Sequence, residues 1–360
     1  MTRTLAVRLD SDGDVLLMGP AIRALAATSS GLDLLVSPAG EQAANLLPGV
    51  DRVLVFAAPW TGYQPPPVDA PAVDALVRTL AEPGYDRAVI FTSFHQSPLP
   101  MALLVRLAGI GWAGADCVDY PGSLLDLRHQ RAEGHEVEAA LALATAAGGR
   151  LPAGDDGRLA VCSPLPDVSR LVPTEPYVVV HPSAAVPARS LRADHAGAIV
   201  ADLASSGWPV VVTGGAADAE LCGFVSRDSA RDLAGRTTLA ELAGVLAGAS
   251  CVVAVNTGPA HLAAAVGTPV VCVFAPVVPA SRWAPYGVPL VLLGDQDAAC
   301  RDSRARDCPL PGHPCLSTVA PAAVTDAVAA LTGGVRTPAF AAAEHPGGLV
   351  GRPAGPVHRH

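Results

Sequence analysis

Short runs of apolar, largely β-branched residues alternate with amphipathic helical stretches along most of the chain, and this alternation restricts its fold more than any other feature. In the first half, the runs predict strands near residues 4–9, 32–36, 52–56 and 87–92. The stretches between them predict helices near residues 14–28, 70–81, 99–108 and 133–147. Strands that alternate with helices form parallel sheets covered by helices on both faces, so we expect an α/β fold.

A proline-rich segment divides the alternation into two halves. Residues 163–176 hold four prolines in fourteen positions, a density that blocks both a helix and a sheet ladder. We therefore expect an interdomain linker there, between one domain at 1–165 and another at 176–332. Residues 333–360 show no periodicity and are predicted to be a disordered tail. The elements expected in the second half are strands near 177–181, 209–213, 251–255 and 270–274, and helices near 193–206, 217–229, 239–247, 259–266 and 320–332. Two doubly wound domains place a ligand in the cleft between them, at the carboxyl ends of strands.

The charged residues exclude several classes of function. The formal net charge is -9, so the chain has no basic excess with which to bind nucleic acid or an anionic membrane. All 24 basic residues are Arg, because the sequence contains no Lys. This excludes chemistry that needs a lysine amine, including a Schiff base, a Walker P-loop and pyridoxal phosphate catalysis.

The sequence predicts a cytoplasmic protein. Acidic and basic residues interrupt the first apolar run from Arg3 to Asp14, so no hydrophobic core of a secretory signal is present there. The forty residues 242–281 contain no Asp, Glu, Lys or Arg. Asn256, His261 and four prolines interrupt this stretch, and we interpret it as a buried strand–helix–strand unit rather than a membrane span. The eight cysteines are expected to be reduced thiols.

The turn after the run 251–255 is a candidate anion site. Asn256 and Thr257 are good N-cap residues, and Pro259 suits the first turn of a helix. Gly258 allows a ligand to approach the backbone closely. Free N–H groups at the positive end of a helix favour a diphosphate, and His261 lies one turn further on. The alternative interpretation is an ordinary strand-to-helix turn with a buried histidine.

Three alternating aspartates follow the first predicted strand, and three interpretations compete for them. A calcium loop would need Gly and Glu where Val15 and Ala21 stand, which argues against it. A phosphatase of the haloacid dehalogenase type also begins with Asp-x-Asp-Gly, and it would use Asp10 and Asp12, but such enzymes usually carry a Lys. The third interpretation makes Asp14 a general base, kept ionised by a helix N-terminus. We expect Asp10 and Asp12 to be solvated caps.

A third segment of small residues, 181–192, also follows a predicted strand. A loop of this kind with one or two arginines can clamp a diphosphate, and Arg189 is the candidate. Ser183 lies in the same loop. The neighbouring strand end, with Thr213 and Gly214, is a candidate floor for a nucleoside.

Two other patterns do not fit the sites that they resemble. The stretch 109–114 matches G-x-G-x-x-G, but it follows a helical pattern rather than a strand, so we do not expect a dinucleotide site. Cys300, Cys308, His313 and Cys315 are spaced without the close C-x2-C pair that is typical of zinc. A thiol-rich loop is therefore expected, and no metal site or cofactor.

Several of these segments together resemble glycosyltransferase family 9, the ADP-heptose:lipopolysaccharide heptosyltransferase family. The resemblance spans about residues 3–332 and rests on four segments, 11–16, 256–262, 274–276 and 283–287. It implies a GT-B fold of two Rossmann-like domains, with the acceptor in the N-terminal domain and the donor in the C-terminal domain. It also implies inverting transfer without a metal. The residues that it assigns are Asp14 as base and Asn256, Thr257, Gly258, His261 and Arg189 as diphosphate ligands.

The chain departs from the family pattern at four positions. Asn256 stands where many members have Asp, and Ser190 and Leu191 replace a second basic residue and Trp. Ser303 stands where members with a fuller cysteine cluster can have Cys. These departures concern the identity of the sugar more than the chemistry.

The sequence therefore predicts an inverting, metal-independent glycosyltransferase. Its donor would be a nucleotide-diphosphate sugar, heptose-like and ADP-linked, and its acceptor a hydroxyl of a cell-envelope or other glycan or glycolipid. Ser11 and Gly13 are assigned to the acceptor-side loop, and Pro259 to the donor site. We expect no nucleic acid partner, and membrane proximity only through the acceptor. The alternatives are a phosphohydrolase that uses Asp10 and Asp12, and a relative that binds nucleotide sugars without catalysis.

Overall fold

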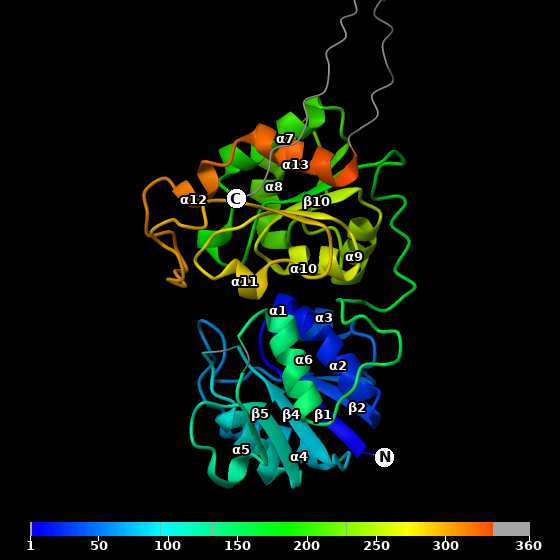
Figure 1. The fold of residues 1–360 in the computed structure, drawn as a ribbon, viewed down its shortest axis with the longest axis vertical. Coiled ribbons are helices and arrows are strands. Elements are labelled where there is room, and N and C mark those ends of the chain that lie inside the picture. The colour runs from blue at the N-terminus through cyan, green and yellow to red at the C-terminus, as the bar shows by residue number, and fades with distance from the viewer. Residues whose placement is uncertain (1, 94, 132, 228, 334–360) are drawn as a thin grey trace, which may run out of the picture.

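The computed structural model describes residues 2–93, 95–131, 133–227 and 229–333, and it contains two parallel sheets of six strands each (Figure 1). The predicted tail lies outside the described residues apart from Gly333, which ends the last helix. In the described part of the chain, no helix is long and apolar enough to cross a bilayer. The predicted α/β class, with two doubly wound halves, is confirmed.

The first half has the strand order β3-β2-β1-β4-β5-β6, with every neighbouring pair parallel. The order reverses between β1 and β4, and open α/β sheets bind ligands beyond the carboxyl ends of strands at such a switch point. Its strands are β1 (Thr2–Arg8), β2 (Ser29–Val36), β3 (Arg52–Val55), β4 (Arg87–Phe91), β5 (Trp112–Asp116) and β6 (Leu127–His129). Its helices are α1 (Asp12–Leu17), α2 (Gly19–Ala26), α3 (Glu41–Ala44), α4 (Ala70–Ala81), α5 (Leu99–Leu107) and α6 (Glu136–Ala146).

The second half repeats the plan with the order β12-β11-β10-β7-β8-β9, again parallel throughout. Its switch point lies between β10 and β7. Its strands are β7 (Val178–His181), β8 (Val210–Val212), β9 (Arg231–Asp232), β10 (Cys251–Val255), β11 (Val270–Val273) and β12 (Leu290–Leu293). Its helices are α7 (Ala193–Ser205), α8 (Ala219–Ser226), α9 (Leu239–Ala247), α10 (Gly258–Ala265), α11 (Ala280–Trp283), α12 (Pro314–Ser317) and α13 (Pro321–Thr332).

The central strands of both sheets are buried on both faces, which explains their unbroken apolar runs. Every residue of β10 is buried between β7 and β11. The same holds for β1 from Thr4 onward, between β2 and β4. The stretch 242–281 contains α9, β10, α10 and β11, so its interpretation as a strand–helix–strand unit is confirmed.

Several elements of the first half differ from the sequence prediction, and α3 and β6 are among those that were not predicted. The single helix expected at 14–28 is wrong, because α1 ends at Leu17 and α2 begins at Gly19, with Pro20 in its first turn. A proline lacks the N–H that an uninterrupted helix would need at that position. The strand β5 was not predicted, although α5 before it confirms that the G-x-G-x-x-G stretch follows a helix.

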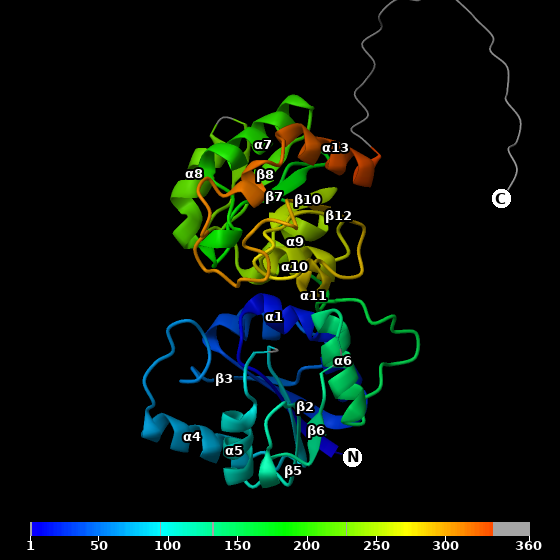
Figure 2. The ribbon, with the colours of Figure 1, turned by 60° about the vertical axis from the view of Figure 1, so that its left-hand side comes forward.

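The two halves meet along helices that belong to their switch points. In both views α1 lies at the top of the first half, facing α10 and α11 of the second (Figures 1 and 2). The contact between α1 and α10 is the most extensive one between helices of different halves. The chain that connects the halves contacts the first half and then the second. The Cys162 N–H donates to the Leu46 carbonyl of the first half, and Val168 packs against Gly244 of the second. The boundaries at 165 and 176 remain predictions.

Candidate active site

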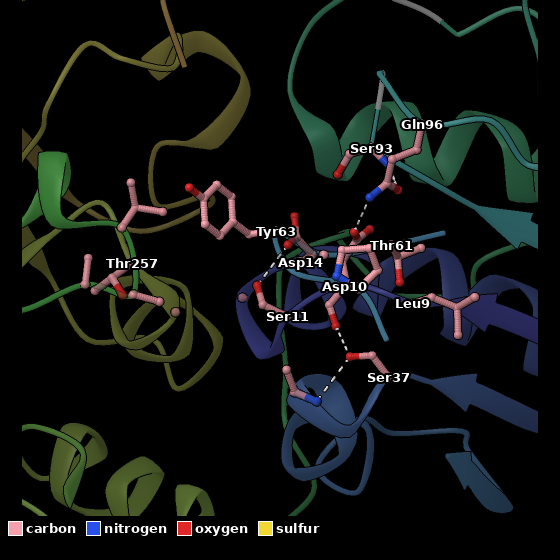
Figure 3. A pocket seen from close by; sticks show the side chains of 18 of the residues that line it. Leu9, Asp10, Ser11, Asp14, Ser37, Thr61, Tyr63, Ser93, Gln96 and Thr257 are labelled. Atoms are coloured by element: carbon pink, nitrogen blue, oxygen red, sulfur yellow. Dashed lines mark hydrogen bonds between the residues drawn. The ribbon is translucent and has the colours of Figure 1, made fainter. Parts of the chain in front are cut away.

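A cavity of about 720 Å³ lies between the halves, at the carboxyl ends of strands of both sheets. The first half lines it with the segments that follow β1, β2, β3 and β4, and the second half lines it with segments that follow β7, β10, β11 and β12. Figure 3 shows Asp10, Ser11 and Asp14 on the first-half side, with Thr257 across the cavity from them. The remaining lining residues used below are Gly13, Tyr63, Ser93, Gln96, Arg189, Asn256, Gly258, His261, Trp283 and Arg304.

Two side chains fix the carboxylate of Asp14 in the first turn of α1. The Arg8 guanidinium donates from Nη2 to Oδ1 at 3.1 Å, and the Ser11 hydroxyl donates to Oδ2 at 2.9 Å. Arg8 is the last residue of β1 and its side chain is only 5% exposed, whereas that of Asp14 is 24% exposed. The base candidate therefore faces the cavity while its partner is buried beneath it.

Asp10 is not a solvated cap, so that expectation is wrong. Its Oδ2 pairs with Nε of Arg8 at 2.7 Å, and Gln96 donates to its Oδ1 at 2.7 Å. The side chain is only 10% exposed. Burial raises the pKa of Asp10, and the charge of Arg8 opposes that rise. A carboxylate whose two oxygens are both engaged in this way is poorly suited to the nucleophilic role of the phosphohydrolase alternative.

Asp12 does not act as a solvated cap of its own helix, because it is half-buried and bonds to a residue of α3. Its Oδ1 accepts the backbone N–H of Ala43 at 2.9 Å, which ties the start of α1 to α3. Burial raises the pKa of Asp12, and the bond from Ala43 opposes the shift. The expectation of a solvated cap is therefore corrected to a tertiary contact between two helices.

The turn between β10 and α10 has the predicted strand-to-helix geometry. Thr257 is the N-cap in an extended conformation, its side chain makes no capping bond, and Pro259 lies in the first turn. Asn256 is 5% exposed and holds the turn against the end of β11: its Nδ2 donates to the Ala275 carbonyl at 3.2 Å, and its Oδ1 accepts the Ala275 N–H at 3.1 Å. The Asn256 side chain therefore positions the turn through the backbone of Ala275.

His261 lies one turn into α10 and lines the cavity. Burial lowers its pKa to about 4, so the imidazole is neutral near pH 7. Its Nδ1 is buried and has no hydrogen-bond partner among the described residues. A neutral imidazole carries one N–H and one acceptor nitrogen, so it can bond a ligand without adding charge.

The two predicted turns touch each other directly. A Cβ atom built on Gly13 would lie 3.2 Å from Cα of Gly258 and 3.3 Å from Cδ2 of His261. Both distances are shorter than ordinary van der Waals contact, so a larger residue here would push the two turns apart by a few tenths of an ångström. The base candidate and the anion candidate are thus brought together by backbone contact between α1 and α10.

Arg189 ends a short 3-10 helix, Pro187–Arg189, in the loop after β7. Its Nε is buried without a hydrogen-bond partner in the described part of the chain. Burial lowers its pKa from the ordinary arginine value, and the charge of Asp14 opposes this shift. A guanidinium in this state is suited to an anionic ligand.

Four predicted donor residues lie away from the cavity lining. Thr213 and Ser183 are buried, and the Thr213 hydroxyl bonds to Nδ1 of His181 at 2.9 Å. A Cβ atom on Gly214 would lie 2.7 Å from Sγ of Cys222, so that position is packed. Pro259 is not part of the lining either. The structure brings the other predicted residues together, and these four keep their roles only as predictions.

Several residues in or beneath the cavity wall were not found from the sequence. Arg8 gave no signal beyond a charge inside an apolar strand, yet it organises both aspartates. Ser93 and Gln96 follow β4, and their place at the carboxyl end of the strand beside β1 could have indicated them. Tyr63 and Arg304 lie on irregular segments whose positions depend on the tertiary fold.

No group of three or more His, Cys, Asp or Glu in the described part of the chain is arranged to hold a metal ion. Burial raises the pKa of the Cys315 thiol to about 12, so it stays protonated.

Comparison with known proteins assigns the family. The model of glycosyltransferase family 9 (heptosyltransferase) matches residues 73–313, more than half of the chain. The chain belongs to glycosyltransferase family 9. The match includes Arg189 and the turn at 256–261, whereas the turn that carries Asp14 precedes it. This family 9 member is accordingly a glycosyltransferase. The comparison with curated protein sequences gives no match.

Solved structures share its GT-B architecture. E. coli ADP-heptose lipopolysaccharide heptosyltransferase II has a TM-score of 0.69 at 20% identity, covering 92% of this chain and 98% of its own. A family 9 glycosyltransferase from Veillonella parvula DSM 2008 has a TM-score of 0.72 at 16% identity, covering 92% of this chain and 97% of its own. E. coli heptosyltransferase WaaC, solved with ADP-2-deoxy-2-fluoro heptose, has a TM-score of 0.64 at 23% identity, covering 90% of this chain and 98% of its own. At these identities the similarity establishes the fold.

Proposed function

We propose that this family 9 enzyme transfers a heptose-like sugar from an ADP-linked donor to a hydroxyl of a glycan or glycolipid acceptor, with inversion and without a metal. The observation that carries the proposal is that one cavity joins Asp14 of the first half to His261 and Arg189 of the second. E. coli WaaC has been solved with ADP and with an ADP-heptose analogue, which supports an ADP-linked donor here.

In this proposal the second half binds the donor. The diphosphate lies against the N-terminus of α10, whose dipole favours negative charge. Arg189 contributes a guanidinium whose Nε has no partner in the described residues, and His261 contributes a neutral N–H. As the bond to the sugar breaks, these groups stabilise the charge that develops on the diphosphate. They supply the positive potential that a metal would otherwise provide.

The first half binds the acceptor and supplies the base. The acceptor hydroxyl gives its proton to Asp14 while its oxygen attacks the anomeric carbon from the face opposite the diphosphate. The new C–O bond forms as the old one breaks, and the bonding electron pair leaves with the diphosphate. Attack from that face inverts the configuration. Arg8 and Ser11 orient the carboxylate for this step.

The first experiment is a thermal-shift panel of ADP, GDP, UDP and TDP, with and without EDTA, on the wild type and on His261→Ala. A ligand that binds only the folded state raises the melting temperature. We expect ADP to stabilise the wild type equally with and without EDTA, and to stabilise His261→Ala much less. Stabilisation only by Mg²⁺ with beryllofluoride would instead support a phosphohydrolase.

The second experiment is turnover of ADP-heptose, followed as ADP release. Release of ADP with formation of an inverted glycoside would support the transferase. A protein that binds ADP-heptose and leaves it intact with every acceptor, and with water, would be a relative that has lost catalysis.

A further inference from the structure

One of the four segments that carry the family resemblance, residues 283–287, has no role in the proposed function. It begins at the last residue of α11, Trp283, which lines the cavity. Trp283 and Tyr286 also pack against an apolar cluster that contains Leu17 of α1 and Val137 of α6. The segment is therefore both part of the cavity wall and a surface against which the first half packs.

The first turn of α6 contacts this segment, and Figure 2 shows α6 just below α11. Nε2 of His135 bonds to the Ala284 carbonyl at 2.8 Å, and the His135 ring centroid lies 4.7 Å from that of Tyr286. Next to it, the Glu136 carboxylate lies 3.7 Å from the Arg282 guanidinium, and the Glu136 side chain is only 3% exposed. A hydrogen bond, a ring contact and an ion pair thus join α6 to the second half at one place.

His135 uses both of its ring nitrogens. Nδ1 accepts the N–H of Val137 at 3.2 Å and so caps the N-terminus of α6. Burial lowers the pKa of His135, so the imidazole is neutral near pH 7. Because Nδ1 accepts, Nε2 carries the proton and donates it to the Ala284 carbonyl. Asn, Asp, Ser or Thr would cap the helix at least as well, so only the bond to the second half needs the longer side chain.

The same turn of α6 also acts on the groups beneath the base. Burial would lower the pKa of Arg8, but the charges of Asp10, Asp14 and Glu136 raise it above the ordinary arginine value. Arg8 in turn donates to the Asp14 carboxylate at 3.1 Å. The start of α6 is therefore coupled electrostatically to the partner of the base and bonded directly to the second half.

We infer that His135 is a positioning residue of the transfer: by holding α6 to Ala284 it sets how Asp14 of the first half faces His261 of the second. The inference rests on the proposed function, because it takes these two side chains as reacting groups. α6 packs against α1, which carries Asp14, and Ala284 directly follows Trp283 of the cavity wall. Loss of this bond therefore shifts one wall of the cavity relative to the other, and small misplacements of reacting groups cost up to about 10²-fold in rate.

Two substitutions separate the two bonds of His135. The side-chain oxygen of Asn takes the position of Nδ1, so His135→Asn keeps the cap on Val137 but is too short to reach Ala284. The side-chain amide of Gln extends to the position of Nε2, so His135→Gln keeps a donor to Ala284 and loses the cap. For each variant, kcat is measured as ADP release from ADP-heptose with an alkyl heptoside or water as acceptor. The melting temperature is measured with and without ADP.

The two variants are expected to fail in opposite ways. His135→Asn should melt close to the wild type and keep the thermal shift caused by ADP, but its kcat should fall at least tenfold. His135→Gln should melt at a lower temperature and keep most of its kcat. A His135→Asn protein as active as His135→Gln would overturn the inference. So would losses of kcat that follow the melting temperature in both variants, since His135 would then only support the fold. No ADP release by the wild type would instead contradict the proposed function.

Hydrogen exchange tests the bond between the halves without turnover. Backbone amides of residues 280–288 should exchange faster in His135→Asn than in the wild type, because the segment is no longer held by α6. In His135→Gln this segment should exchange as in the wild type, and the first turn of α6 should exchange faster instead. Equal exchange of residues 280–288 in both variants would overturn the inference, whatever the outcome of the activity assay.

Discussion

Asp14 owes its orientation to an arginine that the cavity does not reach. Arg8 is 4% exposed, and its guanidinium contacts Asp10, Asp14 and Ser93 at once. A buried guanidinium is stable only when carboxylates pair with it, and two are present here. The geometry leaves part of the Asp14 carboxylate exposed to the cavity, where a proton can be received.

Replacing this carboxylate by an amide tests its role as base. Asp14→Asn keeps the shape of the side chain but cannot take a proton. We expect kcat to fall by about 10²–10⁴, the range typical of a lost general base. The thermal shift caused by ADP should remain. Ser11→Ala, which removes one hydrogen bond to the same carboxylate, is the control and should lose much less activity. Full turnover by Asp14→Asn would rule out the assignment.

Two buried histidines predict how stability responds to acid. Burial lowers the pKa of both His181 and His261 to about 4, from an ordinary value of 6.5. Between these values the unfolded chain binds more protons than the folded one, so stability is fully present above pH 6.5 and is lost as the pH falls toward 4. Each histidine contributes up to about 3 kcal/mol to that loss.

The variant His181→Gln isolates one of these contributions. Urea unfolding of wild type and variant at several pH values between 7 and 4 gives the difference in the free energy of unfolding. We expect the variant to lose about 3 kcal/mol less than the wild type over this interval. The raised pKa of Asp10 acts in the opposite direction but is common to both proteins. The prediction would be contradicted if the free energies of unfolding of wild type and variant changed equally with pH.

At the scale of elements, the strand–turn–helix unit β10–α10 depends on one amide side chain. Asn256→Ala removes both hydrogen bonds to Ala275, which is 0% exposed, and leaves its N–H and carbonyl without partners. Buried unpaired groups of this kind cost about 1–3 kcal/mol. We expect a loss of about 2 kcal/mol in the free energy of unfolding and weaker ADP binding.

The neighbouring position provides the matched control. The Thr257 side chain makes no capping hydrogen bond, so Thr257→Ala should change stability by less than about 0.5 kcal/mol. Chemical denaturation measures the loss in the free energy of unfolding that each of the two substitutions causes. Equal destabilisation by the two substitutions would show that the turn is not held by Asn256.

The elements that could be predicted are those whose own residues specify them. The valine run of β10 followed by Asn-Thr-Gly-Pro predicts a strand, a cap and a helix start, and all three are observed. By contrast, β5 reads Trp-Ala-Gly-Ala-Asp and has no β-branched residue. It becomes a strand because β4 and β6 pair with it on both sides, and this tertiary effect is invisible in the local pattern.

The residues of the candidate site also differ in how well the sequence could predict them. Asp14 and His261 follow strand ends in recognisable motifs, so the sequence could place them at one edge of a sheet. Tyr63 lies on a long irregular loop, and its ring contacts Arg306 of the other half, so its position depends on the tertiary fold. The roles of Asp10 and Asp12 were misjudged because their partners, Arg8 and Ala43, are defined by the fold rather than by spacing.

At the scale of the whole molecule, apolar side chains of α1 and α6 pack against α10 and, together with polar contacts, join the two halves. His135 bonds through Nε2 to the Ala284 carbonyl at 2.8 Å, and its ring lies 4.7 Å from that of Tyr286. The Leu239 N–H donates to the Gln42 side chain at 3.1 Å. The cavity lies beside this packed contact, so the position of Asp14 relative to His261 depends on it.

The close contact between the halves at Gly13 gives a prediction about this packing. Gly13→Ala places a methyl group 3.2 Å from Cα of Gly258 and 3.3 Å from His261, so the halves must separate by a few tenths of an ångström. Because small misplacements of reacting groups cost up to about 10²-fold in rate, we expect kcat/KM to fall at least tenfold. Stability should not fall, since Ala favours a helix over Gly by up to about 1 kcal/mol.

Gly111→Ala is the control for this prediction, because Gly111 has no neighbour within 4 Å of an added Cβ. It should retain wild-type kcat/KM. Both kcat/KM and the free energy of unfolding are measured for each variant, and the loss of activity is compared with the loss of stability. A Gly13→Ala protein that is as active as Gly111→Ala would mean that the halves need not come this close for transfer. A Gly13→Ala protein that loses activity only in proportion to lost stability would mean that the contact supports the fold and not the reaction.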